Sequence, residues 1–305
     1  MTKIQDQTSK PFRLAPTFSA RIWGRDDLKP WYDKSGLTEK IGEAWLTGPE
    51  SLVETGELAG KTLSEIAPLM TCGGEFPLLV KILFPNEKLS VQVHPDDAQA
   101  KLLGLERGKT ECWYVLAAEP GATIACGLLD GSGPTEVEKA VAAGTLESLL
   151  KMVPVKVDDM IFVDAGTVHA IGPGVTLLEV QQTCDVTYRL YDYGRPRELH
   201  LEAGLAVVKT KTDAGLIAPR QMDGFTRLID AKYFVVDRYA LQPGATANLE
   251  NPSAGCIVGL AGSGSVGDVE VFAGRAVVLP KGTSSIETAG GATFAFCWEP
   301  TQAPL

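Results

Sequence analysis

Short apolar or alternating runs, separated by glycine and proline, constrain the fold of this chain more than any other feature. One set of runs lies at residues 76–84, 88–93, 112–117, 123–128, 160–163, 176–180 and 186–191. A second set lies at residues 233–241, 256–260, 269–272, 275–279 and 293–298. Runs of this length with turn residues between them are typical of β-sandwiches and barrels. The pattern predicts a mainly β protein.

Helices are expected only between these runs. Thr62–Glu65 and Thr135–Glu138 both match the T-x-x-E capping box, and the second opens a segment that stops at Gly144. Residues 95–103 begin with a proline and two aspartates, which favour a helix N-terminus, and residues 199–208 form an amphipathic segment. The sequence therefore predicts a few short helices inserted among strands.

The length suggests two domains, since 305 residues at about 150 per domain make roughly two. The polar stretch 209–220 separates the two sets of runs, so we predict an N-terminal domain of residues 1–220 and a smaller C-terminal domain of residues 221–305. The C-terminal domain contains a GxGxxG match at residues 262–267. A dinucleotide site would need a helix directly afterwards. Residues 268–272 read as a strand instead, so a glycine-rich hairpin is expected.

Charge and cysteine content exclude several classes of partner. The chain carries 28 lysines and arginines against 38 acidic residues, a net charge of −10, which disfavours nucleic acid as a partner. No apolar stretch approaches the roughly 18 residues of a membrane span, and no membrane partner is expected. Six scattered cysteines without a CxxC pair are typical of a reduced protein without cysteine-bound zinc. We expect a cytoplasmic protein.

Two short segments place polar side chains on one face of a strand. Residues 92–94 read QVH, and the period of two along a strand puts Gln92 and His94 on the same face. Residues 108–111 read GKTE, and the same period puts Lys109 and Glu111 on a common face. The first segment predicts two metal donors, and the second places a cation beside a carboxylate.

A third segment, DAGTVH at residues 164–169, turns at a glycine and brings His169 to the entry of a strand. Together, Gln92, His94, Glu111 and His169 offer two imidazoles, a carboxylate and an amide oxygen from three strands of one barrel. This set suits one Zn²⁺ ion with an open position for water or substrate. An amide ligand is unusual for zinc, so Mn²⁺ and Fe²⁺ stay as alternatives.

The competing interpretation of each histidine is a structural one, because a histidine near a strand end is more often hydrogen-bonded than metal-bound. Two of the three histidines in the chain, His94 and His169, fall in polar motifs flanked by glycine or proline. That coincidence favours ligation for both. We interpret His200, in the helical segment RPRELHLE, as structural.

The strand at residues 186–191 carries an arginine on a face that is otherwise expected to be buried. Alternation places Thr187, Arg189 and Tyr191 together, and a buried arginine is costly without an anion. The anion is either a ligand or a neighbouring carboxylate, Asp185 or Asp192.

Several segments resemble the signature segments of type I phosphomannose isomerases in their short bacterial form. They read KILFPNEKLSVQVHPDD, GKTECWYVL, GTVHAIG and LLEVQQTCDVTYRLYDYGR, and RIWGRDDL and IGEAWLTGPES are similar to the N-terminal segments of that family. The resemblance runs in order from about residue 11 to residue 197. It implies a pair of cupin β-barrels, with the zinc held by Gln92, His94, Glu111 and His169.

The same resemblance implies roles for three further residues: Arg189 as the catalytic arginine, Lys109 as the lysine beside the zinc-binding glutamate, and Glu179 as a second active-site acid. It implies the interconversion of mannose 6-phosphate and fructose 6-phosphate through a cis-enediol, which needs a base, a proton shuttle and stabilisation of oxyanion charge. Glu179 and Lys109 are both candidates for the base.

The substrate would be a small-molecule sugar phosphate, a dianion that needs local positive charge. Ser90 and Lys81 are our candidates for holding its phosphate. We expect a monomer or a homodimer. Two alternatives to the isomerase are a non-catalytic cupin that senses hexose phosphate, and a metal cupin oxygenase, which would have no evident use for Lys109 and Arg189.

Overall fold

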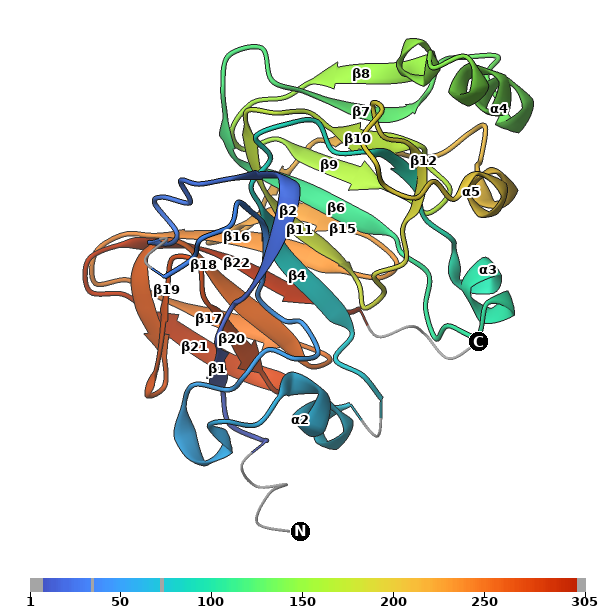
Figure 1. Cartoon of the computed structure of the whole chain (residues 1–305). Coiled ribbons are helices and arrows are strands. Elements are labelled where there is room, and N and C mark those ends of the chain that lie inside the picture. The colour runs from blue at the N-terminus through green and yellow to red at the C-terminus, as the bar shows by residue number, and fades with distance from the viewer. Residues whose placement is uncertain (1–7, 34–35, 72–73, 301–305) are drawn as a thin grey trace. The chain divides into compact units, whose positions relative to one another are not determined.

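The structure is a computed structural model that describes residues 8–33, 36–71 and 74–300. It consists mainly of antiparallel strands with a few short helices (Figure 1), so the predicted mainly β architecture is confirmed. The chain divides into two compact units. The central unit comprises Arg21–Arg25 and Leu83–Ile217. The flanking unit comprises the described residues up to Ala20, Asp26–Ile82, and the described residues from Ala218 onward.

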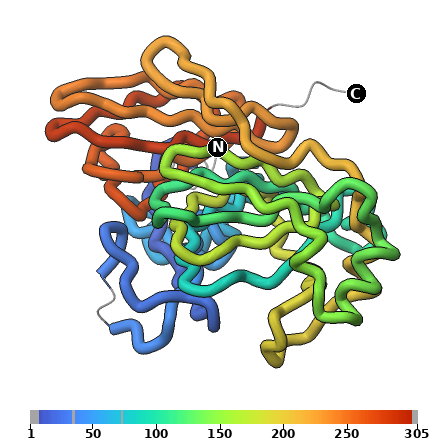
Figure 2. Tube along the Cα trace, turned by 90° about the horizontal axis from the view of Figure 1, so that it is seen from above, coloured from blue at the N-terminus to red at the C-terminus, as the bar shows by residue number. Residues whose placement is uncertain are grey.

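The central unit holds two antiparallel sheets, in which the chain runs back and forth (Figure 2, green to yellow). The first sheet has the order β12-β5-β10-β7-β8, and the second contains the run β13-β9-β6-β11. The strands are β5 (Val91–Val93), β6 (Glu111–Ala118), β7 (Thr123–Leu128), β8 (Leu150–Pro154), β9 (Met160–Val163), β10 (His169–Ile171), β11 (Val175–Gln182), β12 (Tyr188–Tyr191) and β13 (Gly215–Ile217). The helices are α3 (Asp97–Leu102), α4 (Pro134–Ala142), η2 (Leu146–Leu149) and α5 (Leu201–Val207).

Alternation along the strands gives each sheet of this unit an inner face. The inner core combines residues of both sheets, including Trp113 and Val115 of β6, Ile124 of β7, Ile171 of β10 and Leu177 of β11. Side chains one position away point to the opposite face, because successive residues of a strand alternate. The two sheets thus enclose a barrel interior that is apolar along most of its length.

Helices cover the outer face of the first sheet. Val91 and Val93 of β5 belong to a second cluster with Val137 of α4 and Val207 of α5. Because Val91 and Val93 point outward, the residue between them points inward. The packing of α4 and α5 therefore fixes which side chains of this sheet reach the barrel interior.

The flanking unit contains a ten-stranded sheet with the main order β1-β20-β18-β22-β16-β15-β14. Its strands are β1 (Phe12–Leu14), β14 (Arg220–Gln221), β15 (Thr226–Asp230), β16 (Val235–Leu241), β17 (Thr246–Asn251), β18 (Gly255–Val266), β19 (Val269–Phe272), β20 (Ala276–Leu279), β21 (Gly282–Glu287) and β22 (Ala292–Trp298). The unit also contains β3 (Ile41–Trp45), η1 (Gly56–Leu58) and α2 (Leu63–Met70). β2 (Thr17–Arg25) and β4 (Leu78–Leu83) pass from one unit into the other.

This division differs from the predicted boundary between residues 220 and 221, because Asp26–Ile82 groups with the C-terminal strands. Specific contacts explain the grouping. β1 pairs with β20, the Tyr32 hydroxyl donates to the Gly274 carbonyl (2.7 Å), and Trp31 Nε1 donates to the Leu260 carbonyl (3.2 Å). These partners are more than 200 positions apart, a distance over which local sequence patterns carry no information.

The predicted helix starts have mixed outcomes. Thr62 caps α2 in a capping box with Glu65, as predicted. The Thr135 cap is wrong: α4 begins at Pro134, and Glu136 accepts a hydrogen bond from the Gly133 backbone (3.0 Å). Proline at the first helical position explains the earlier start, since its fixed φ suits a helix and its missing N–H needs no partner there.

The glycine-rich motif at residues 262–267 forms no dinucleotide site, because β18 pairs with β19 as an antiparallel hairpin across it. Within the described ranges, the structure has no helix long and apolar enough to cross a membrane.

Candidate active site and metal centre

A row of side chains crosses the first sheet of the central unit on its inner face. His169 of β10 lies opposite Cys126 of β7 on one side and opposite Gln92 of β5 on the other. Gln92 in turn lies opposite Arg189 of β12. Residues directly opposite in neighbouring strands point to the same face. The row therefore brings Gln92, His169 and Arg189, which are up to 97 positions apart in the sequence, to one place.

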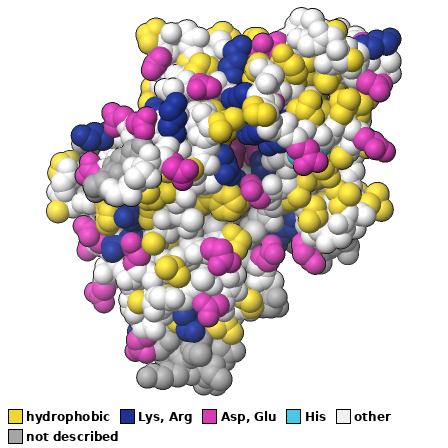
Figure 3. Space-filling view, in the orientation of Figure 1, with side chains coloured by type: hydrophobic (Ala, Val, Ile, Leu, Met, Phe, Trp, Pro, Cys, Tyr) yellow, Lys and Arg dark blue, Asp and Glu magenta, His cyan; other side chains and the backbone are white. Residues whose placement is uncertain are grey.

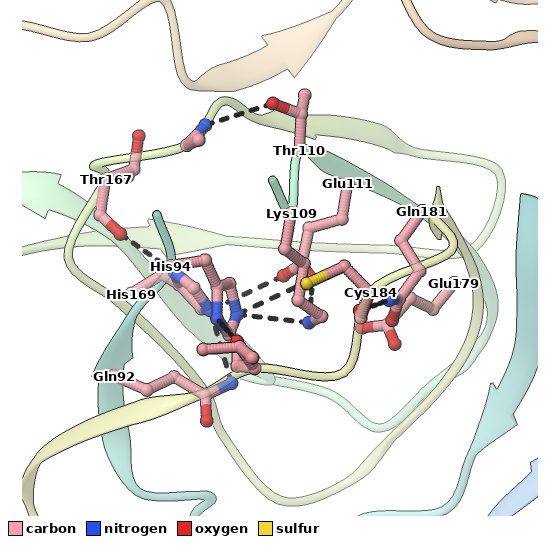
Figure 4. Close-up of polar contacts among 12 residues, drawn as sticks. Gln92, His94, Lys109, Thr110, Glu111, Thr167, His169, Glu179, Gln181 and Cys184 are labelled. Carbon is pink, nitrogen blue, oxygen red and sulfur yellow. Dashed lines mark hydrogen bonds and ion pairs between the residues drawn. The ribbon is translucent and has the colours of Figure 1, made fainter. Parts of the chain in front are cut away.

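The second sheet supplies the carboxylates. Glu111, the first residue of β6, lies opposite Gln181 of β11, and Glu179 of β11 lies opposite Trp113. Trp113 is part of the inner core, so Glu111 and Glu179 share its face. The two sheets thus present acids from one side and nitrogen donors from the other, as Figure 4 shows.

His94 follows the last residue of β5, and two backbone contacts fix its position. Its carbonyl accepts from the Gly166 backbone (2.9 Å), which ties it to the loop that leads into His169. Gly108 lies against the turn that follows His94, where an added Cβ would come within 2.4 Å of the Asp96 carbonyl carbon. Only glycine lets the backbone at position 108 come this close to the turn. The segment that leads into β6 therefore lies beside His94.

The hydrogen bonds of the two histidines decide which ring nitrogen is available. Nδ1 of His94 lies 2.8 Å from the Val186 carbonyl, and Nδ1 of His169 lies 2.9 Å from the Thr167 carbonyl. Carbonyl oxygens only accept, so both Nδ1 atoms carry a proton, and Nε2 is the ring nitrogen of each histidine that can face a metal. Metal-bound histidines are commonly held in this way.

Burial keeps His169 neutral. Removal from water lowers the pKa of His169 to about 4, although its contact with the Thr167 carbonyl acts in the opposite direction. At neutral pH its approach to Glu111, 3.4 Å from Nε2 to Oε1, is therefore not an ion pair. Two lone pairs face each other across this gap, an arrangement that a cation would stabilise.

The three donor groups of His94, Glu111 and His169 lie within 4.8 Å of one another, and all three residues are buried. Oε1 of Glu111 has no hydrogen-bond partner, which is rare for a fully buried carboxylate oxygen. Very little histidine surface shows on the face drawn in Figure 3, in keeping with the burial of His94 and His169. Imidazole and carboxylate donors suit a borderline divalent ion. The unsatisfied oxygen and the two lone pairs fit a bound metal.

Gln92 lies beside this group, with its side-chain amide nitrogen 3.2 Å from His169 Nε2. Rotation of the amide exchanges its nitrogen and oxygen, because the two atoms occupy equivalent positions. Gln92 is thus within reach as a fourth donor. The structure brings all four predicted ligands together.

Lys109 contacts the same group. Its Nζ forms a short contact with Glu111 Oε2 and lies 3.0 Å from His94 Nε2. Burial alone would lower the pKa of Lys109, but the carboxylates of Glu111 and Glu179, with a smaller effect from Asp185, raise it above its ordinary value. The lysine is an ammonium ion in this arrangement. Sequence reasoning did not give Asp185 a role at Lys109.

Glu179 is buried on β11, where its Oε2 accepts a hydrogen bond from Trp113 Nε1 (3.1 Å). Its charge acts on both Lys109 and His169. A carboxylate at this position can take up or release a proton inside the barrel.

Arg189 lies next to Gln92 on the sheet, with its Nη1 donating to the Glu198 carbonyl (2.6 Å). Its Nε atom is buried and has no hydrogen-bond partner. Burial and then the neighbouring cations Arg197 and Arg195 lower the pKa of Arg189, while the carboxylates of Asp192 and Glu198 act in the opposite direction. Asp192 forms ion pairs with Arg195 and Arg197 instead of the pair with Arg189 that the sequence offered as an alternative.

His200 positions Arg189 from the start of α5. Nδ1 of His200 accepts from the Arg189 backbone N–H (3.1 Å), and the His200 backbone N–H donates to the Arg189 carbonyl (2.8 Å). His200 is thus a structural residue, as predicted, and the strand that it holds is the one that carries Arg189. Its link to Arg189 becomes visible only in the folded structure.

The two candidates for the phosphate lie in different units. Ser90 is buried directly before β5 in the central unit. Lys81 belongs to the flanking unit, where its Nζ lies 3.8 Å from Glu43 Oε2 and 4.4 Å from the centre of the Trp45 ring. The contacts of Ser90 and Lys81 do not test whether either residue binds the phosphate, so both roles stay predictions.

Comparisons with known proteins all point to one family. The family described as "Phosphomannose isomerase type I, catalytic domain" matches residues 12–125. The chain is 35% identical over 266 residues to the mannose-6-phosphate isomerase ManA of Bacillus subtilis, covering 80% of this chain and 84% of that protein. The chain belongs to the type I phosphomannose isomerase family.

A second relative and a solved structure extend the match. The mannose-6-phosphate isomerase of Streptococcus mutans is 36% identical over 278 residues, covering 85% of this chain and 87% of that protein. The crystal structure of the mannose 6-phosphate isomerase from Bacillus subtilis superposes with a TM-score of 0.83 at 31% identity, covering 94% of this chain and 99% of that one. Membership of this phosphomannose isomerase family makes the chain an isomerase and confirms the cupin-type fold that the sequence implied.

Proposed function

We propose that this isomerase interconverts mannose 6-phosphate and fructose 6-phosphate and uses one zinc ion per chain. The observation that carries the proposal is the buried group of His94, Glu111 and His169, in which Glu111 Oε1 has no hydrogen-bond partner and lies 3.4 Å from His169 Nε2. A purely structural cluster would satisfy that oxygen by a hydrogen bond.

His94, Glu111 and His169 would hold the metal, with Gln92 as the fourth ligand. Zinc bound there would act as a Lewis acid toward an oxygen of the sugar. With a single anionic ligand, the site keeps net positive charge. Mn²⁺ and Fe²⁺ fit the same donors and are outcomes of the metal analysis.

The chain's own residues would move the protons. Interconversion of the aldose and the ketose takes a proton between C1 and C2 through a cis-enediol, so one base must lie beside these carbons. The ion pair of Lys109 with Glu111 favours Glu179 as this base and leaves Lys109 as a proton donor to oxygen. Arg189, whose buried Nε atom has no hydrogen-bond partner, would stabilise the developing negative charge on the enediol oxygens.

Ser90 and Lys81 are each proposed separately as a contact of the phosphate. Lys81 already pairs with Glu43, so its charge is partly neutralised, and Lys81→Ala is the direct test. A raised KM for mannose 6-phosphate supports the assignment, whereas an unchanged KM removes it. We propose that the isomerase acts in the cytoplasm as a monomer or a homodimer.

A coupled assay that converts mannose 6-phosphate to fructose 6-phosphate tests the proposal. The wild-type protein should turn over, and Arg189→Ala should abolish turnover while the bound metal stays. Arg220→Ala, an exposed arginine of the flanking unit, is the matched control and should keep wild-type turnover.

Two results would point elsewhere. Sugar phosphate bound without turnover by the metal-loaded wild type indicates a hexose-phosphate sensor. Oxygen consumption with an iron-loaded protein indicates a cupin oxygenase.

A further inference from the structure

Gln182 is a buried amide that ends β11, and both ends of its side chain are hydrogen-bonded. Its Oε1 accepts from the Thr110 backbone N–H (3.0 Å), and its Nε2 donates to Asp97 Oδ1 (2.9 Å). The Gln182 backbone N–H also donates to the Thr110 carbonyl (3.2 Å). Gln182 is 2% exposed and belongs to none of the groups described above as a metal donor or a proton carrier.

Thr110, the partner of Gln182, stands between Lys109 and Glu111, the two residues that contact each other beside the histidines. All three of its polar groups are engaged. Besides its two backbone bonds to Gln182, its Oγ1 accepts from the Ala165 backbone N–H (3.3 Å), in the loop that leads into His169. A shift of Thr110 would therefore move both Glu111 and the approach to His169.

Asp97 connects Gln182 to the segment that carries His94. The same Oδ1 atom that accepts from Gln182 accepts from the Gly108 backbone N–H (2.9 Å). Asp97 begins α3, three residues after His94, and the Lys109 backbone N–H donates to the Pro95 carbonyl in the turn between them (2.9 Å). The turn after His94 is thus fixed against the segment that carries Glu111.

We propose that Gln182 is a positioning residue that sets the spacing of His94, Glu111 and His169 through Thr110 and Asp97. The proposal rests on the metal site of the proposed function. One amide with two oriented hydrogen bonds joins three segments that come from different parts of the chain. Partners behind the ligands typically change metal affinity about 10–100-fold when they are removed.

The test compares metal affinity, by competition with a chelator, between the wild type and Gln182→Met. Methionine keeps the length and burial of the side chain but removes both hydrogen bonds. We expect zinc to bind about 10–100-fold more weakly, with a fall in kcat and little change in KM. Asn251→Leu is the matched control: it removes a buried amide that donates to two carbonyls in the flanking unit. This control should lower the melting temperature without changing the zinc affinity.

A double-mutant cycle separates positioning from simple loss of packing. Asp97→Ala removes the carboxylate that accepts from both Gln182 and the Gly108 backbone, so zinc should bind more weakly. If Gln182 acts through Asp97, adding Gln182→Met to Asp97→Ala should weaken zinc binding by less than Gln182→Met does in the wild type. Losses that add fully are expected if Gln182 only fills space.

The outcomes separate the two proposals. A wild type that binds no divalent metal overturns the metal site and the role of Gln182 together. A wild type that binds zinc, with Gln182→Met binding equally tightly, overturns only the role of Gln182. Losses of zinc affinity from Gln182→Met and Asp97→Ala that add fully in the double variant also overturn it.

Discussion

At the scale of single residues, Glu111 is the buried carboxylate on which the whole site depends. One of its oxygens is in contact with the Lys109 ammonium, and the other has no hydrogen-bond partner. Removing one member of a buried ion pair leaves an uncompensated charge, which typically costs about 3–5 kcal/mol. Lys109 therefore stabilises the metal-free protein as well as taking part in the proposed chemistry.

Lys109→Met should lower the free energy of unfolding of the metal-free protein by about 3–5 kcal/mol. Zinc should restore much of this loss, because the ion compensates the Glu111 carboxylate that the lysine no longer pairs. Urea unfolding with and without zinc measures both quantities. Lys101→Met, an exposed lysine of α3, should behave as wild type. If zinc stabilises Lys109→Met no more than it stabilises the wild type, the compensation argument fails.

At the scale of elements, the close contact of Gly108 with the turn after β5 is the clearest constraint. A Cβ at this position would lie 2.4 Å from the Asp96 carbonyl carbon and 2.7 Å from the Pro95 carbonyl oxygen, and neither backbone atom can move independently. Gly108→Ala should cost about 1–3 kcal/mol of stability and weaken zinc binding as well. Gly290→Ala, where an added Cβ meets nothing within 4 Å, should change stability by less than about 0.5 kcal/mol. Equal stability and zinc affinity in the two variants would show that the turn adapts.

The capping box of α2 gives a prediction about pH. Hydrogen bonds from the backbone and hydroxyl of Thr62 lower the pKa of Glu65 from 4.5. A carboxylate with a lowered pKa stabilises the fold above its unfolded pKa, and this contribution is lost as the pH falls through the folded value. Glu65→Gln should therefore be less stable than wild type at pH 7, and the difference should shrink as the pH falls through the folded pKa of Glu65, below 4.5. A difference that does not shrink on acidification would mean that the charge of Glu65 is not its source.

The same element predicts the effect of the cap itself. Thr62→Ala should lower stability by about 1 kcal/mol, because the Glu65 backbone N–H loses its acceptor. Thr62→Ser keeps the hydroxyl and should retain most of the stability. Thermal unfolding of both variants at pH 7 measures the difference, and equal losses would show that the methyl group rather than the hydroxyl matters.

The elements also show how far sequence patterns reach. Alternation correctly placed Gln92 inward between Val91 and Val93, and the Gly-flanked DAGTVH segment does bring His169 to a strand entry. The pairing of His169 with Gln92, and of Gln92 with Arg189, depends on sheet register between distant segments, which no local pattern specifies. The roles of His200 and Gln182 are of the same kind. His200 acts through hydrogen bonds to the backbone of Arg189, and Gln182 acts through the backbone of Thr110, which lies between Lys109 and Glu111.

At the scale of the whole molecule, the net charge of −10 opposes the approach of a sugar phosphate dianion. In the central unit Arg189, Arg195 and Arg197 can offset this locally, against the carboxylates of Asp192 and Glu198 that lie beside them. Salt screens both the attraction of the substrate by these arginines and its repulsion by the net charge. The stronger of the two decides whether added salt lowers or raises kcat/KM.

We expect kcat/KM for mannose 6-phosphate to fall as the NaCl concentration rises from about 0.05 M to about 0.5 M, where the screening length drops to a few ångströms. The fall follows if local attraction by the arginines dominates. Steady-state kinetics at constant pH provide the measurement. A rise in kcat/KM with salt would show that the overall negative charge controls the encounter.

The most direct test of the account is a titration of the metal-free protein with zinc, in which turnover of mannose 6-phosphate to fructose 6-phosphate is followed at each step. We expect no turnover without metal and a linear increase that saturates at one zinc ion per chain. Glu111→Gln, which keeps the shape of the ligand but removes its charge, should shift saturation to much higher zinc concentrations. Full turnover by the metal-free protein, or one bound zinc per chain without turnover, would contradict it.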